Sequence, residues 1–187
     1  MNVYRIIADS DEYEHIYADE NDRDVLYFNK CHSLIKDWKP RFILPDERLT
    51  DNSMNERTPK KGDFPSLYRP TPVFSQRAWD ILSPLIATFV EPLPLIHPSG
   101  EIYFAINVLE LVDCLNLTQS KVTRNDASGR ISKIHLYRFK RQLLEDKHIF
   151  KLPETMGLEV LVSQEFKDLV TVNCLDGLIF EMIASYA

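Results

Sequence analysis

The chain has 187 residues, of which 44% are hydrophobic, and its formal net charge is −6. This composition is ordinary for a globular protein with a sizeable core, and no uninterrupted apolar stretch reaches the roughly 18 residues that a membrane span needs. The first apolar run, residues 3–8, is short and soon followed by acidic residues. We therefore expect no cleaved signal peptide, no membrane span and a cytoplasmic location.

The amino-terminal part is predicted to contain short strands separated by polar segments. Residues 3–8 are rich in branched side chains, which favours a strand, and residues 25–28 form a second short apolar run. Residues 41–44 are predicted to be extended because prolines flank them on both sides. From residue 46 to residue 69 the sequence is polar and poor in aliphatic side chains, which indicates a long loop. A domain boundary is therefore predicted near residue 70.

An acidic segment follows the first strand and holds nearly all of the excess negative charge. Residues 1–30 contain eight acidic and three basic residues, a net charge of −5, and two tyrosines are interleaved with the carboxylates. Such charges speed association with a basic partner, and tyrosines supply contact area that becomes buried. The alternative is a solubilising loop. The candidate partner-binding residues are Asp11, Glu12, Tyr13, Glu14, Tyr17, Asp19 and Asp22.

The second part of the chain contains two similar strand, cap and helix units. In the first, Ser75 is the predicted N-cap of a helix that Pro84 is expected to end or kink. In the second, a strand that ends at Ser163 precedes another helix. Between the two units we expect an edge strand over residues 90–96, which hold two prolines, and a buried strand or strand-to-helix passage over residues 101–112.

Further strands are predicted over residues 130–137, whose alternating pattern indicates a half-buried strand, and over residues 177–182. The fold class is therefore α+β, with a mostly antiparallel sheet, a few short helices and two loosely separated lobes, residues 1–70 and 71–187.

The residues that usually carry catalysis or metal binding do not form a recognisable motif in this sequence. The five glycines are isolated, and neither a Gly-x-Ser-x-Gly nor a His-Glu-x-x-His motif occurs. The three cysteines are widely spaced and are expected to be buried free thiols. No catalytic residue, metal ligand or cofactor is predicted.

Basic residues cluster between residues 121 and 141, where they could contact nucleic acid. Acidic neighbours and the net negative charge of the chain favour a mixed, solvated face instead. The cluster consists of Lys121, Arg124, Arg130, Lys133, Arg138, Lys140 and Arg141.

From about residue 70 to the end, the sequence resembles the immunity protein eleven family of bacterial polymorphic toxin systems. The segments that carry the resemblance include residues 91–95, 103–108, 131–139, 149–152 and 177–180, together with the two capped helices. The resemblance implies a cytoplasmic protein without enzymatic activity that neutralises a cognate toxin by binding it. The toxin would be a protein with a basic surface, and neither nucleic acid nor a membrane is expected as a partner. Two alternatives remain open: a small enzyme with a site assembled from scattered Asp, Glu and His residues, and a nucleic-acid-binding regulator that uses the basic cluster.

Overall fold

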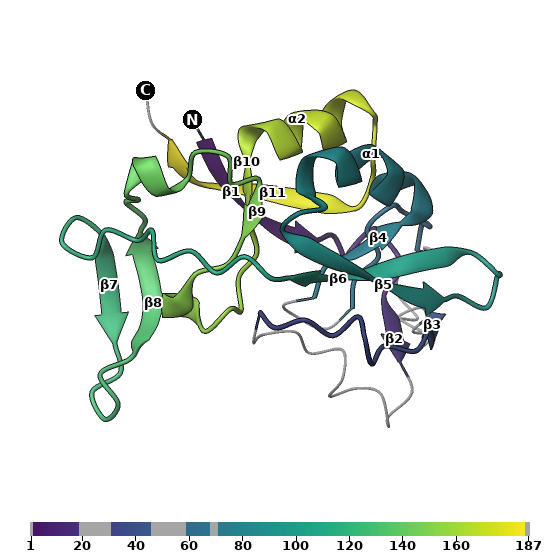
Figure 1. Ribbon diagram of the computed structural model, residues 1–187, viewed down its shortest axis with the longest axis horizontal. Helices are drawn as coiled ribbons and strands as arrows, with labels where there is room; N and C mark the ends of the chain where they lie inside the picture. Colours follow the sequence, from purple (N-terminus) through teal and green to yellow (C-terminus); the bar gives the residue numbers. More distant parts are fainter. Residues whose placement is uncertain (1, 19–30, 46–58, 68–70, 186–187) are drawn as a thin grey trace.

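A computed structural model describes residues 2–18, 31–45, 59–67 and 71–185, and these form three β-sheets and two α-helices (Figure 1). Most strand pairs are antiparallel, which confirms the α+β class predicted from the sequence. The strand predicted over residues 25–28 lies outside the described residues.

The four-stranded sheet brings the beginning and the end of the chain together. Its order is β11 (Leu178–Ser185), β1 (Asn2–Ala8), β10 (Leu161–Ser163) and β9 (Ile149–Phe150), with all neighbours antiparallel. The strands predicted over residues 3–8 and 177–182 are therefore present. The domain boundary at residue 70 stays a prediction, and β1 is hydrogen-bonded to strands on the other side of it.

The five-stranded sheet has the order β2 (Ile16–Ala18), β3 (Arg41–Pro45), β5 (Val90–Ile96), β6 (Ile102–Val108) and β4 (Val73–Ser75). Only the pairing of β3 with β5 is parallel. Within residues 101–112, for which a buried strand or a strand-to-helix passage is predicted, Ile102–Val108 form the strand β6.

The prediction that residues 90–96 form an edge strand is wrong, because β5 has a neighbour on each side. β6 pairs along its whole length, whereas β3 pairs only with Leu95 and Ile96. Pro92 and Pro94 therefore lie where β3 does not pair, and their missing N–H groups remove no hydrogen bond to β3.

The two predicted strand, cap and helix units are both present. The Oγ atoms of Ser75 and Ser163 accept hydrogen bonds from Ala78 N at 3.0 Å and Phe166 N at 3.2 Å. These bonds begin α1 (Gln76–Ile86) and α2 (Gln164–Val172), which pack against each other (Figure 1). Of the two expectations for Pro84, that it ends α1 is wrong, and that it kinks the helix stays a prediction. Pro84 is exposed, so the carbonyl that loses its intrahelical partner faces solvent, and the helix continues to Ile86.

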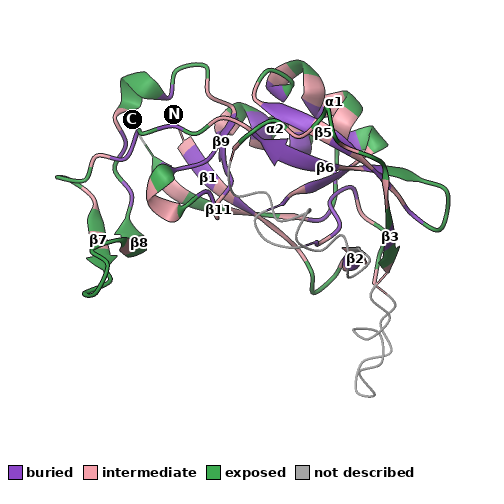
Figure 2. Cartoon of the chain, turned by 60° about the horizontal axis from the view of Figure 1, so that its bottom comes forward, coloured by how far each residue is buried: buried purple, intermediate pink, exposed green. Residues whose placement is uncertain are grey.

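A third, two-stranded sheet consists of β7 (Lys121–Arg124) and β8 (Ile131–Leu136) and pairs with no other strand in the described residues. We refer to residues 121–136 as the arm. It projects from the rest of the molecule (Figure 1) and is mostly exposed (Figure 2). Only Ile134 of the arm is buried, in a core cluster shared with Val112 and Leu115.

The main core lies between α1, α2 and the two larger sheets, and includes Phe74, Leu82 and Phe166. All three cysteines are free, but only Cys114 is buried, whereas Cys31 is half-buried and Cys174 is exposed. The expectation of three buried thiols therefore holds for Cys114 alone.

Candidate partner-binding surface

The acidic segment begins with a tight turn that directs carboxylates to solvent. The Asp9 side chain accepts hydrogen bonds from the backbone N–H groups of Asp11, at 3.2 Å, and Glu12, at 3.3 Å. The backbone N–H of Tyr13 donates to the Asp9 carbonyl at 3.0 Å, which closes the turn. Aspartate stabilises turns in this way because its short side chain reaches backbone N–H groups two and three residues ahead. Asp11 and Glu12 are exposed as a result.

Glu12 is paired with Lys60 across the surface, with 2.9 Å between Oε2 and Nζ. Both side chains are more than half exposed, at 52% and 65%. Exposed pairs of this kind contribute little to stability, so Glu12 can exchange Lys60 for a basic group of a partner at small cost.

Tyr13 is fixed against the backbone of Gly62. A Cβ atom on Gly62 would lie 2.5 Å from Tyr13 Cδ1 and 3.1 Å from the carbonyl oxygen of Asp176. The tyrosine ring therefore rests where only glycine leaves room. Desolvation raises the pKa of the Tyr13 hydroxyl, and the negative charge of Asp176 adds to the increase.

Replacing Gly62 by alanine should displace the Tyr13 ring, because the new methyl group overlaps it and the adjoining Asp176 backbone cannot move freely. We expect a loss of about 1–3 kcal/mol in the free energy of unfolding. Chemical denaturation measures this loss. The contribution of Tyr13 to the tyrosine fluorescence is the difference between the spectra of the unmodified protein and of Tyr13→Phe. The control is Gly100→Ala, where no atom lies within 4 Å of the added Cβ but the positive φ of +83° adds backbone strain. Unchanged Tyr13 fluorescence in Gly62→Ala would contradict the packing described.

Glu14 differs from its neighbours because its side chain points inward. The side chain is only 13% exposed, and Oε2 lies 3.4 Å from Nε2 of the buried His97. On its other side, the His97 ring lies 2.7 Å from Ser99 Oγ, which donates to Glu101 at 2.6 Å. Glu101 also pairs with Lys61 at 2.7 Å. Glu14 is thus part of a polar row that connects the acidic segment to the loop between β5 and β6.

The remaining candidates of the acidic segment are placed differently. Tyr17 lies half-buried in β2, opposite Leu44 of β3. Asp19 and Asp22 lie outside the described residues.

An open groove of about 550 Å³ adjoins the acidic turn. Gly62 belongs to the groove wall and also supports Tyr13, so the two features share one edge. The charged residues that line the groove are Lys61, Asp63, Arg77, Glu101 and Asp176.

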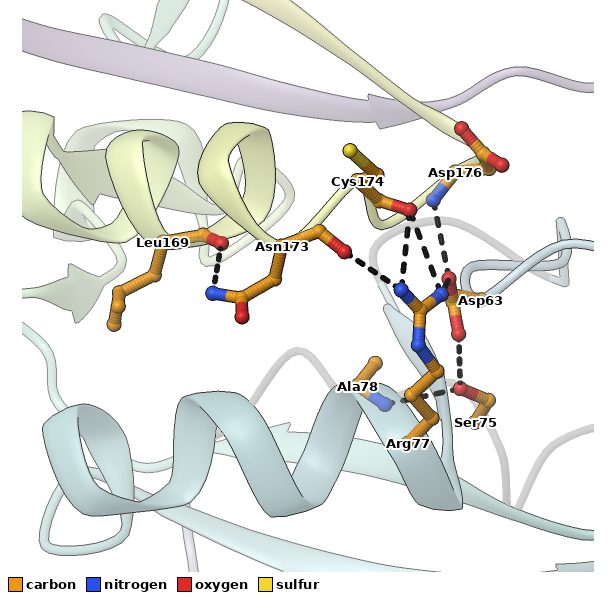
Figure 3. A network of polar contacts seen from close by, with 8 residues as sticks. All are labelled: Asp63, Ser75, Arg77, Ala78, Leu169, Asn173, Cys174 and Asp176. Atoms are coloured by element: carbon orange, nitrogen blue, oxygen red, sulfur yellow. Dashed lines mark hydrogen bonds and ion pairs between the residues drawn. The ribbon is translucent and has the colours of Figure 1, made fainter.

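The inner wall of the groove is fixed by the carboxylate of Asp63, whose side chain is only 10% exposed. It accepts hydrogen bonds from Ser75 Oγ at 2.7 Å, from Arg77 Nη1 at 2.8 Å and from the backbone N–H of Asp176 at 3.2 Å (Figure 3). A buried carboxylate needs several donors of this kind, and here they come from segments far apart in the sequence.

Arg77 joins the two helices at this wall (Figure 3). Arg77 lies in the first turn of α1. Its Nη2 atom donates to the Asn173 carbonyl at 2.6 Å and lies 3.4 Å from the Cys174 carbonyl. These carbonyls follow the end of α2, where a positive charge is favourable. Arg77 therefore holds the end of α2, and with it the exposed Asp176, beside the groove.

No sequence motif indicates that Asp63, Arg77 and Asp176 belong to one site. The N-cap pattern located Ser75, but the long-range contacts of the other three residues leave no periodic signal. A lone glycine at residue 62, between charged residues, is the one local hint that a side chain packs closely there.

No group of three or more potential metal ligands occurs in the described parts of the chain. Among the same residues, no helix has the length and apolar character required to cross a bilayer. The chain is thus an α+β protein whose candidate site is a charged surface with an anchored tyrosine and an open groove.

Residues 96–185 match the Immunity protein family (Imm11), a little less than half of the chain. This match confirms the family resemblance that the sequence suggested. It includes β6 to β11 and α2, whereas the acidic turn lies outside it. A comparison with curated proteins gives no significant match.

Proposed function

We propose that this protein is an immunity protein that binds a cognate toxin effector in the cytoplasm and neutralises it by direct protein contact. The match of residues 96–185 to an immunity protein family is the observation that supports this most strongly. Proteins of such a family act by binding, so the proposal requires no catalytic group.

The acidic turn and the adjoining groove are the proposed contact surface. Asp11 and Glu12 present exposed carboxylates, and Tyr13 supplies a ring whose position Gly62 fixes. A basic toxin surface would be attracted by the carboxylates and then bury the tyrosine. Tyr17, Asp19 and Asp22 are proposed to extend the same surface, and Glu14 to support it from within through His97.

The expected effect of the charges is on the rate of association. The double variant Asp11→Ser/Glu12→Ser should bind the toxin about three to ten times more slowly at low salt, and its association rate should depend less on salt. Stopped-flow measurements at two salt concentrations test this. Tyr13→Ala should instead speed dissociation, because it removes buried contact area.

The matched control is Asp80→Ser/Asp168→Ser, on α1 and α2. It removes two exposed carboxylates from other parts of the surface and changes the net charge equally. Equal association rates for the unmodified protein and the Asp11→Ser/Glu12→Ser variant would show that the acidic turn is a solubilising loop.

A further inference from the structure

The arm is a rigid projection and not a loose loop. At its tip, Asn125 Oδ1 accepts hydrogen bonds from the backbone N–H groups of Ala127, at 3.1 Å, and Ser128, at 3.0 Å. Gly129, with a φ of +67°, returns the chain to β8 in a conformation that favours glycine. The polar groups of the turn are thus satisfied internally, and the arm has a defined shape before any partner binds.

The base of the arm is anchored to β1 by a partly buried polar network. Tyr137, the residue after β8, accepts a hydrogen bond from Arg5 Nη2 at 2.6 Å and donates to Glu159 at 2.8 Å. Arg5 also pairs with Glu159 at 2.9 Å. These contacts fix the direction in which the arm projects, which lowers the entropic cost of binding through it.

The arm is strongly cationic, although the chain as a whole is acidic. Lys121, Arg130 and Lys133 are exposed, and none of them makes an ion pair with another described residue. Arg124 donates to the Gly129 carbonyl at 2.9 Å, and Asp126 is the one acidic residue between residues 121 and 136. Exposed cations gathered on one projection create a local positive potential, which attracts carboxylates.

Exposed leucines accompany these cations at the base of the arm. Leu136, Leu117 and Leu143 are 40%, 44% and 43% exposed. Leu136 ends β8, and Leu117 follows Asn116, whose backbone N–H donates to the Arg138 carbonyl at 2.7 Å. An apolar patch bordered by charges is the usual composition of a protein–protein interface.

We infer that the arm is a second docking surface, which binds a carboxylate-rich patch of the toxin protein. This inference rests on the proposed function, because it takes the toxin as the partner. A protein fits better than nucleic acid for two reasons. The arm contains no Phe, Tyr or Trp on which a base could stack, and its one imidazole, of His135, is hydrogen-bonded to Thr123 at 2.8 Å. The net charge of −6 also repels a polyanion at long range.

The arm and the acidic turn are independent elements. The arm lies at the opposite end of the molecule from β2, the strand that follows the acidic turn (Figure 1). Substitutions at the two places should therefore have additive effects on the affinity for the toxin.

The test is the double variant Lys121→Glu/Lys133→Glu in the full chain, with the purified toxin domain as the probe. Both side chains are exposed and unpaired, so the melting temperature should not change, whereas the Kd for the toxin should rise about tenfold or more at low salt. In the unmodified complex, a carbodiimide, which joins amines to carboxylates in direct contact, should link Lys121 or Lys133 to Asp or Glu residues of the toxin. Lys36→Glu/Lys39→Glu is the control, because it changes the net charge equally on an exposed segment before β3.

Each other outcome overturns the inference in a distinguishable way. Equal affinity of the unmodified protein and the arm variant, without cross-links from the arm, would remove the arm from the interface. Binding of a short duplex DNA that the arm variant loses would identify a nucleic-acid surface instead. Absence of toxin binding by the unmodified protein would overturn the proposed function and this inference together.

Discussion

Replacing Phe166 by alanine is expected to lower the free energy of unfolding by about 3–5 kcal/mol. The Phe166 side chain is 0% exposed, and its ring centroid lies 6.3 Å from that of Phe74 and 6.4 Å from that of Phe180. It therefore packs between β4, which precedes α1, and β11. Alanine at residue 166 would leave a cavity between two sheets and two helices, and these elements cannot all move inward to fill it. The full cost of the lost contacts should therefore appear in the free energy of unfolding.

Urea denaturation followed by circular dichroism measures this loss. Leu82→Ala, at an equally buried position of α1, should cost about 2–5 kcal/mol. Val172→Ala is the control, because this residue ends the same helix as Phe166 but is 75% exposed and should change stability by less than about 0.5 kcal/mol. If Phe166→Ala and Leu82→Ala both unfold at the same urea concentration as the unmodified protein, the packing of the two capped helices is incorrect.

Replacing Lys151 by methionine is expected to change the pH dependence of the free energy of unfolding by about 3 kcal/mol between pH 8 and 10.5. Lys151 is 0% exposed, and its backbone forms an isolated parallel β-bridge with Leu111, which fixes its position. Burial lowers the pKa of its ammonium group from 10.5 to about 8, and the nearby Cys31 opposes this change. The charged form is therefore costly in the folded state, and methionine fills a similar volume without a charge.

The same pKa difference predicts how stability changes with pH. Between pH 8 and 10.5 the unfolded chain holds the Lys151 proton and the folded protein releases it, so the contribution of Lys151 to stability should increase as the pH rises. Buried tyrosines act in the opposite direction above pH 10. Burial raises the pKa of Tyr103 to about 12, so only the unfolded state ionises there. Burial also raises the pKa of the Cys114 thiol to about 12, so ionisation of this thiol in the unfolded chain opposes the Lys151 effect from about pH 9. The Lys151 effect is therefore measured as the difference between the unmodified protein and Lys151→Met.

Between pH 8 and 10, the free energy of unfolding of the unmodified protein should rise relative to that of Lys151→Met, because the variant lacks the Lys151 contribution. Denaturation curves at several pH values provide the measurement. The matched control is Lys36→Met, because Lys36 is exposed and its replacement should leave the pH dependence intact. An equal pH dependence in Lys151→Met and the unmodified protein would show that Lys151 is not the group responsible.

The local elements of the fold could be predicted from the sequence, because local chemistry determines them. The hydroxyl groups of Ser75 and Ser163 cap helices at the expected places, and the branched residues of β1 and β11 form strands. The neighbours of each strand could not be predicted in this way. The position of β5 inside a sheet depends on the partial pairing of β3, which leaves no signal in the sequence of β5 itself.

The candidate surface was predictable to a smaller extent. The excess of acidic residues located the turn that exposes Asp11 and Glu12, but charge counting cannot distinguish an exposed carboxylate from one that faces a buried histidine. Glu14 is of the second kind because His97, more than eighty residues away in the sequence, packs beside it. The groove wall formed by Asp63 and Arg77 depends on long-range contacts in the same way.

The central place of β1 in its sheet has a consequence for folding during synthesis. β1 is synthesised well before its two neighbours, β10 and β11, which begin only at residues 161 and 178. At typical translation rates the ribosome needs roughly 10–30 s to reach them, and until then β1 exposes unpaired edges. The sheet closes only when the last strand has left the ribosome, so a nascent chain cannot hold this core in its final form.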